Sequence, residues 1–315
     1  MVRYEPLDGF ELSGCAVRRW NIIAFWGQKW DNPDPLDVRT TRLYFYYPDE
    51  PEDARWAYSE IGQARGVRGC AAALPEDRWV FVADDGEVFV VGGGVEGFEE
   101  PISPESLAFF SGVKRVAPGR AFAVGPRRKV FVREGPGVWR RLVEGLPTGD
   151  AAQLETSAFS DIDGFTESDL YACGGQGDLW HFNGRSWTRI DLPTNDTLWR
   201  VCCASDGVVY VTTGQRQVLA GRDSSWVTVR QEVTDEALES VVDFQGKVII
   251  STQSALYEVA AGALQPASLG TIPPMHTYSH LAVGDGILVV AGSNDASSFD
   301  GSDWSVIIES GPPRR

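Results

Sequence analysis

Short runs of apolar and β-branched residues, separated by turn-forming residues, dominate the chain. Two examples are the tracts 78–82 (RWVFV) and 207–211 (GVVYV), which have the length and composition of β-strands. Segments with long helical periodicity are hard to find. The pattern therefore predicts an all-β protein.

The clearest unit of this pattern begins at Phe159 and divides into four short strands. We expect these strands at 159–164, 169–174, 178–182 and 187–191. Asn183-Gly184 lies between the third and fourth, and Asn-Gly is a strong hairpin signal. The same layout follows in the next unit and in the last one. The motif F-[ND]-G-x-x-W occurs at 182–187 and again at 299–304, which indicates an internal repeat.

The residue expected to open the fourth strand recurs at spacings of 38 to 48 residues. The candidates are Trp56, Phe98, Trp139, Trp187, Trp226, Leu264 and Trp304. This period is typical of a four-stranded propeller blade. We therefore predict one seven-bladed β-propeller domain over 1–315, with four antiparallel strands per blade. The expected blades are 9–61, 66–102, 111–148, 155–193, 197–233, 238–268 and 277–310.

The inner strands of a propeller crowd its axis and favour small side chains, whereas neighbouring blades cover the apolar faces of each sheet. The candidate inner strands 13–16 (SGCA), 68–71 (RGCA) and 200–204 (RVCCA) fit this requirement. Cys15, Cys70 and Cys202 fall at like positions, and we interpret them as small buried hydrophobes rather than reactive thiols. Ring closure has two alternatives: the last blade packs on the first, or Val2–Leu7 adds a strand.

A resemblance to known proteins rests on the unit with 161–164 (DIDG), 170–177 (LYACGGQG), 180–184 (WHFNG) and Trp187. This unit resembles bacterial β-propeller repeats of the kelch, BNR and photosystem-assembly-factor type. It also resembles propellers found beside secreted polymorphic toxins, which implies an immunity role. The repeat lacks the sialidase-type Asp box, because Ser298 to Trp304 is one residue short, and no WD dipeptide recurs with the period.

Charge narrows the choice of partner. The formal net charge is −16, and such a field repels nucleic-acid phosphate and anionic lipid while attracting basic proteins. The start of the chain lacks an apolar targeting segment, and no apolar run could span a bilayer. The five cysteines show no C-x-x-C or zinc spacing. We expect a cytoplasmic protein with no cofactor, no bound metal, no nucleic-acid partner and no membrane partner.

Two motifs that suggest chemistry are better interpreted as turns. Gly92 to Gly97 satisfies G-x-G-x-x-G, but no helix follows it to hold a dinucleotide. Asp163-Gly164 is predicted to turn the inner strand into the second strand, as are the pairs at 206–207, 245–246 and 285–286. An EF-hand reading of the acids around Asp163 lacks the required spacing.

The insert from Gly27 to Thr41 is the segment that the repeat explains least. We expect it to join the second and third strands of the first blade, on the face where propellers usually bind ligands. Tryptophan and arginine are typical interface anchors, and acidic rims steer basic partners. The candidate partner-binding residues are Trp26, Lys29, Trp30, Asp31, Asp34, Asp37 and Arg39. The alternative is a loop that Trp26 and Trp30 hold against the first blade.

These features favour a non-enzymatic protein-binding propeller, with no catalytic residues assigned. The resemblance implies an immunity protein that neutralises a cognate bacterial toxin by occluding its active site, and the charge favours a basic toxin, notably a nucleic-acid-degrading one. We expect the free chain to be a monomer. A carbohydrate-binding or glycosidase propeller is the alternative, which a pair of carboxylates at the channel mouth would favour. An assembly factor is a minor alternative.

Overall fold

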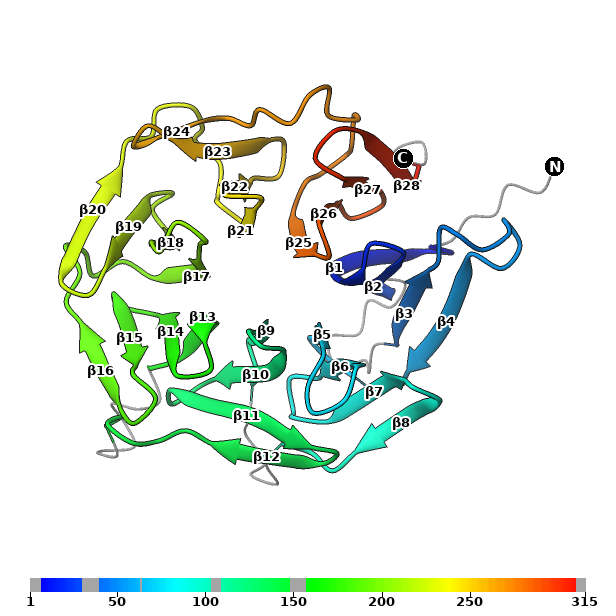
Figure 1. Ribbon diagram of the computed structural model, residues 1–315, viewed down its shortest axis with the longest axis horizontal. Coiled ribbons are helices and arrows are strands. Elements are labelled where there is room, and N and C mark those ends of the chain that lie inside the picture. Colours follow the sequence, from blue (N-terminus) through cyan, green and yellow to red (C-terminus); the bar gives the residue numbers. More distant parts are fainter. Residues whose placement is uncertain (1–6, 30–39, 63, 103–108, 148–156, 310–315) are drawn as a thin grey trace.

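Seven four-stranded antiparallel sheets form a closed ring in the computed structural model (Figure 1). The structure describes residues 7–29, 40–62, 64–102, 109–147 and 157–309. In each blade the strands follow one another in chain order from the axis outward. The seven-bladed all-β prediction is therefore confirmed. The described residues contain no helix that could cross a membrane.

The strand bounds follow the predicted repeat. Blade 1 comprises β1 (Phe10–Arg19), β2 (Ile22–Lys29), β3 (Thr41–Tyr46) and β4 (Trp56–Ile61); blade 2 comprises β5 (Arg68–Ala72), β6 (Arg78–Val82), β7 (Val88–Gly92) and β8 (Val95–Glu99). Blade 3 comprises β9 (Gly112–Val116), β10 (Arg120–Gly125), β11 (Lys129–Gly135) and β12 (Val138–Arg141); blade 4 comprises β13 (Phe159–Thr166), β14 (Asp169–Gly174), β15 (Asp178–Phe182) and β16 (Trp187–Ile190). Blade 5 comprises β17 (Leu198–Cys203), β18 (Val209–Thr213), β19 (Val218–Arg222) and β20 (Ser225–Val229). Blade 6 comprises β21 (Ser240–Phe244), β22 (Lys247–Ser251), β23 (Leu256–Ala260) and β24 (Ala263–Pro266); blade 7 comprises β25 (His280–Gly284), β26 (Ile287–Ala291), β27 (Ala296–Phe299) and β28 (Trp304–Ile308).

The repeated F-[ND]-G-x-x-W motif is a hairpin whose first polar side chain closes the loop. Phe182 pairs with Trp187, and the Asn183 side-chain oxygen accepts hydrogen bonds from the backbone N–H groups of Arg185 and Ser186, both at 3.0 Å. In blade 7, Asp300 likewise accepts from residues 302 and 303, at 2.7 and 2.8 Å. Asparagine and aspartate are favoured here because they can cap their own turn.

The fourth-strand residues all lie in outer strands, but not all of them open the strand. Trp56, Trp187 and Trp304 are first in theirs, whereas Phe98 is the fourth residue of β8 and is 59% exposed. Phe98 lies against Phe89 of its own blade instead of filling a gap between blades. The nearly constant spacing therefore marks the outer strand but not one fixed position in it.

The prediction that Asp163-Gly164 forms a turn is wrong. The strand β13 continues through both residues to Thr166, and the Asp163 carboxylate accepts a hydrogen bond from the backbone N–H of Cys203 in the next blade at 2.9 Å. The pairs at 245–246 and 285–286 do form two-residue turns with positive φ. Gly93-Gly94 likewise turns β7 into β8, as the inter-strand interpretation of that glycine cluster predicts.

The apolar core consists of clusters that lie between neighbouring blades. Cys15, Cys70 and Cys202 are buried on the inner strands β1, β5 and β17. Burial raises the pKa of the Cys15 and Cys70 thiols to about 12 and also raises that of Cys202. These thiols are therefore protonated at neutral pH, in agreement with a packing role.

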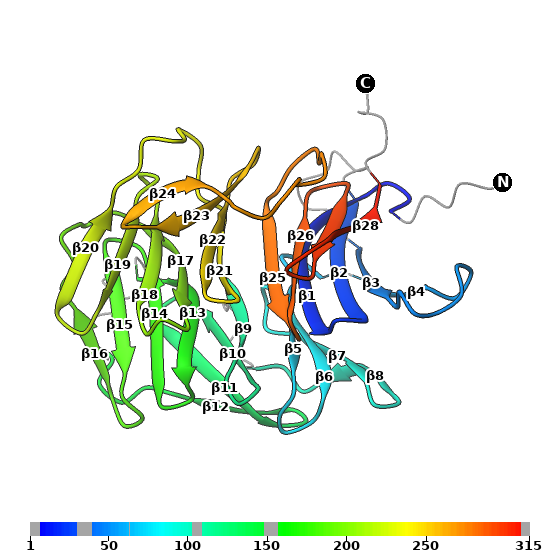
Figure 2. The ribbon, with the colours of Figure 1, turned by 45° about the horizontal axis from the view of Figure 1, so that its top comes forward.

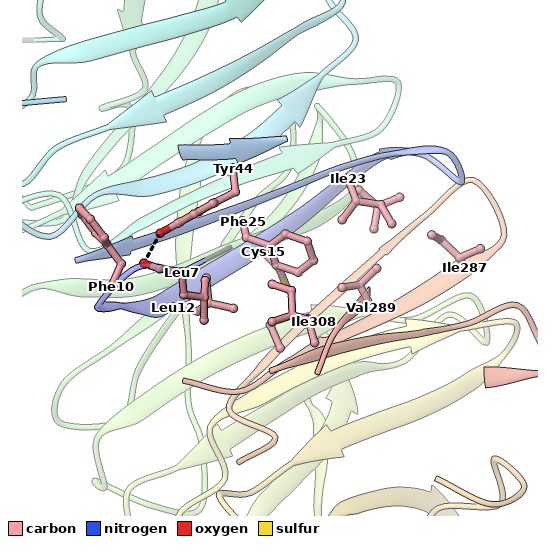
Figure 3. Close-up of a cluster of buried hydrophobic side chains, with 13 residues drawn as sticks. Leu7, Phe10, Leu12, Cys15, Ile23, Phe25, Tyr44, Ile287, Val289 and Ile308 are labelled. Atoms are coloured by element: carbon pink, nitrogen blue, oxygen red, sulfur yellow. Dashed lines mark hydrogen bonds between the residues drawn. The ribbon is translucent and has the colours of Figure 1, made fainter. Parts of the chain in front are cut away.

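The ring closes by direct packing of blade 1 on blade 7. Leu7, Phe10 and Phe25 of the N-terminal segment and blade 1 share one buried cluster with Val289 and Ile308 of blade 7 (Figure 3). The backbone N–H of Leu12 also donates to the carbonyl of Ser293 at 2.7 Å. All four strands of blade 7 come from its own segment. Residues 2–6 of the alternative closing strand lie outside the described residues.

Gly14 is required because the Trp26 indole occupies the space beside it. A Cβ built on Gly14 would lie 2.1 Å from Cζ2 of Trp26, a ring that is 4% exposed and meets Phe81 of blade 2 edge-on. We expect Gly14→Ala to lower the free energy of unfolding by about 1–3 kcal/mol through overpacking. Chemical denaturation measures this change. Gly62→Ala is the control, because no atom lies within 4 Å of its added Cβ. Equal stability of the two variants would contradict the prediction.

Candidate partner-binding site

One face of the ring collects the long connections, and we call it the loop face. Hairpins alternate between the two ends of a blade, so the second-to-third-strand connections and the links between blades end on the same side. The inner strands β1, β5, β9, β13, β17, β21 and β25 surround the ring axis and begin at this face (Figures 1 and 2). Strand β2 ends and β3 begins at this face, so the predicted insert of blade 1 starts and finishes there.

The connection between β2 and β3 is shorter in the structure than the predicted insert from Gly27 to Thr41. Gln28 still pairs with Thr41, so Gly27 to Lys29 belong to β2 and the connection starts only at residue 30. Lys29 is partly buried, with its Nζ 5.9 Å from the centroid of the Phe10 ring. The candidates Trp30, Asp31, Asp34, Asp37 and Arg39 lie outside the described residues.

Trp26 lies in the core between blades 1 and 2. Its ring centroid is 5.7 Å from that of Phe81, and it shares a cluster with Leu43 and Trp79. From this position its side chain holds the two blades together and belongs to strand β2, not to the connection that follows it.

Two arginines and a histidine from three non-adjacent blades lie on inner strands near the loop-face end of the axis. Arg68 opens β5 of blade 2, Arg200 is the third residue of β17 in blade 5, and His280 opens β25 of blade 7. Burial lowers the pKa of His280 to about 4, and the charges of Arg200 and Arg68 add to this effect. Because these blades are not neighbours in the ring, the three side chains influence one another across the axis and not within one sheet. We call Arg68, Arg200 and His280 the axial cluster.

The axial cluster was not among the predicted site residues, although the sequence carries a partial signal for it. Arg68 and Arg200 both stand two residues before a cysteine, in the inner-strand segments RGC and RVC. The repeat thus places two arginines at the same level of the ring. Only the circular arrangement of the blades shows that they face one another.

Deeper along the axis, Lys114 joins three blades. Its ammonium on β9 donates to the carbonyl of Val201 on β17 at 2.8 Å, and it lies 3.7 and 3.4 Å from the carboxylates of Asp161 and Asp163 on β13. Those two carboxylates raise the pKa of Lys114 despite its burial. Lys114 is therefore a fixed positive charge beneath the axial cluster.

The same contacts bear on the glycosidase alternative. Asp161 and Asp163 are neighbouring carboxylates near the axis, but each already accepts a backbone N–H, from Val201 at 3.1 Å and from Cys203 at 2.9 Å. Both also face Lys114. An acid–base pair needs carboxyl groups free to exchange protons with a substrate. This pair instead fastens blade 4 to blade 5, so it does not support the glycosidase alternative.

Large apolar side chains flank the axial cluster on the loop face. Trp199 precedes Arg200, is 47% exposed, and lies near the second-to-third-strand turn of blade 5 at Gly214. Phe109, in the link from blade 2 to blade 3, is 64% exposed. Exposed aromatic residues beside arginine are the composition of a binding hot spot.

The axial cluster predicts how stability responds to acid. In the unfolded chain a histidine titrates near pH 6.5, but folding lowers the pKa of His280 to about 4. Between these values only the unfolded chain binds the proton, so acidification from pH 6.5 to 4 favours unfolding through His280. We expect Tm to fall more steeply over this window in the wild type than in His280→Gln. Calorimetry at several pH values measures both curves, and parallel curves would contradict the prediction.

Comparison with known proteins identifies a relative. No family model matches the chain. The immune protein Tsi7 of Pseudomonas aeruginosa strain PAO1 is 32% identical over 238 residues, which cover 74% of this chain and 76% of that protein. Among solved structures, the WD40 β-propeller domain of Doa1 is similar with a TM-score of 0.64 at 12% identity, covering 94% of this chain and 93% of that one. YCF48 from Cyanidioschyzon merolae gives a TM-score of 0.55 at 14% identity, covering 78% and 86%. These two structures support the fold alone.

Proposed function

We propose, from the premise that the chain belongs to the family of the immune protein Tsi7, that it is an immunity protein that binds and neutralises a toxin. The observation that carries this proposal is the sequence relationship, which spans about three-quarters of both chains. Since it extends over most of the propeller, the two proteins share the binding scaffold and not merely one motif. The chain acts by binding, not by catalysis, and is a monomer when free.

Occlusion is the mechanism that the loop face supports. A partner that covers this face contacts the β2–β3 connection, the links between blades and the axial cluster together. Trp199 and Phe109 offer exposed apolar area there. A rigid propeller face of this kind can cover the active site of an enzyme without changing its own shape.

The charge of the chain favours a basic toxin, notably one that degrades nucleic acid. The chain has 44 acidic and 28 basic residues, and this surplus steers a positively charged partner toward it. Enzymes that act on nucleic acid carry basic surfaces because their substrate is a polyanion. The same surplus of acidic groups keeps the immunity protein away from the nucleic acid itself.

The direct test adds the purified chain to its cognate toxin and measures degradation of DNA and RNA. We expect complete inhibition at one chain per toxin, relieved by excess substrate, because occlusion and substrate binding exclude each other. Binding without inhibition would overturn occlusion. A chain that neither binds nor inhibits the toxin would overturn the immunity role.

The β2–β3 connection is expected to contribute to capture. Replacing residues 30–39 with Gly-Asn-Gly leaves the Gln28–Thr41 pair in place, so we expect an unchanged Tm. Affinity for the toxin, measured by calorimetry, is expected to fall by about 30-fold or more, as for the loss of a hot spot. The matched control replaces residues 49–53, in the β3–β4 connection on the opposite face, and should bind normally. Wild-type affinity of the 30–39 variant would remove this connection from the interface.

A further inference from the structure

The two arginines of the axial cluster direct their hydrogen bonds to backbone carbonyls and not to carboxylates. Within the described residues, neither Arg68 nor Arg200 forms an ion pair, although the chain contains far more carboxylates than basic groups. By contrast, Arg133 and Arg128, elsewhere in the ring, are paired with Glu99 and Asp178. The charge of Arg200 repels that of Arg68 across the axis, and such repulsion between like charges disfavours the folded state.

The hydrogen bonds of the two arginines leave donors available. Arg68 uses Nε and Nη1 on backbone carbonyls, with Ser111 at 3.2 Å and Gly66 at 2.8 Å among them. Among the described residues, Arg200 donates from Nη1 alone, to the carbonyl of Trp199 at 3.0 Å. These bonds orient Arg68 but use none of the Nη2 groups. The free donors suit an oxygen ligand, because a guanidinium binds a carboxylate through two parallel hydrogen bonds.

One acidic side chain, Asp84, offsets part of the charge of this cluster. Asp84 interacts electrostatically with Arg68, but no ion pair joins them, and burial raises the pKa of Asp84. Burial lowers the pKa of Arg68, the charge of Asp84 raises it, and the charge of Arg200 lowers it by a smaller amount. Lys114 below is occupied by Asp161 and Asp163 and by the carbonyl of Val201. The unsatisfied positive charge therefore lies at the loop-face end of the axis.

We propose that the axial cluster binds a carboxylate of the protein partner, an aspartate, a glutamate or a chain end that enters at the loop face. Arg200 and Arg68 hold its oxygens, and the neutral imidazole of His280 supplies a further polar group. This inference rests on the proposed immunity function and names the chemistry of its central contact.

The overall charge argues for a carboxylate carried by a protein and against a free anion. A chain with a net charge of −16 repels small anions and nucleic-acid phosphates. A carboxylate on a basic protein can instead approach, because the positive residues around it are attracted to the acidic chain. Exposed Trp199, next to Arg200 in the chain, can cover the contact and exclude water from it, which strengthens a charged hydrogen bond.

The test compares Arg200→Gln and Arg68→Gln with the wild type for binding to the cognate toxin. We expect each variant to bind about 30-fold more weakly or worse, the loss typical of a buried charged partner. Arg185→Gln is the matched control, because it removes the same charge from an exposed hairpin on the opposite face. We also expect Arg200→Gln to melt no lower than the wild type, since it relieves repulsion with Arg68. A merely structural arginine would give the reverse pattern.

Zero-length cross-linking identifies the ligand. The Arg200→Lys variant, treated with a carbodiimide in the complex, should form an amide bond between its new amine and one carboxylate of the toxin, which mass spectrometry locates. Substituting that carboxylate in the toxin should weaken wild-type binding and have little further effect on Arg200→Gln.

The outcomes that overturn the inference are distinct from those that overturn the proposed function. If the wild type inhibits the toxin and Arg200→Gln and Arg68→Gln inhibit equally well, only the carboxylate contact is wrong. If inorganic phosphate binds the free chain through both arginines, but the arginine variants bind the toxin as tightly as the wild type, the cluster is a free-anion site and the inference is wrong. If the wild type binds no toxin, the immunity role fails and this inference fails with it.

Discussion

The structure depends on burial of the two apolar faces of every blade by its neighbours. A four-stranded sheet cannot bury both faces alone, so each blade is stable only within the closed ring. The decisive interface is the one that chain connectivity does not enforce, where Leu7, Phe10 and Phe25 meet Val289 and Ile308 across the junction of the first and last blades (Figure 3). Because the described residues form no strand shared by these two blades, side-chain packing holds the junction together, with a backbone hydrogen bond from Leu12 to Ser293.

Carboxylates supply a second kind of link between blades. Asp163 accepts the backbone N–H of Cys203, Asp243 accepts that of Ser205 at 2.7 Å, and Asp285 accepts that of Trp20 at 3.0 Å. Each bond joins the inner strand or first turn of one blade to the next and satisfies a donor that no sheet partner reaches. Some of the acidic residues are therefore needed to hold the blades together. The excess of acidic residues is not all available to attract a partner.

The binding face combines this rigid ring with groups that the ring does not use. Lys114 and its carboxylates are mutually satisfied and fix the axis, whereas Arg68 and Arg200 above them lack ion pairs in the described part of the chain. Natural proteins tolerate such unfavourable arrangements where function requires them. Lys114, with its ion pairs, thus serves the scaffold, whereas the arginines above it, which bond only backbone carbonyls in the described residues, are available to a partner.

The sequence by itself determined the fold, the period of the repeat and the strands of its clearest unit, because these are encoded locally. Alternating apolar tracts, the F-[ND]-G-x-x-W turns and the spacing of Trp56, Trp187 and Trp304 each depend on residues close together in the chain. Local signals failed where a distant contact decided the outcome. Asp163-Gly164 has the composition of a turn but continues a strand, because its carboxylate is bonded to the next blade, and Trp26 borders an insert but lies in the core. The axial cluster depended entirely on tertiary structure, since only ring closure brings residues 68, 200 and 280 to one axis.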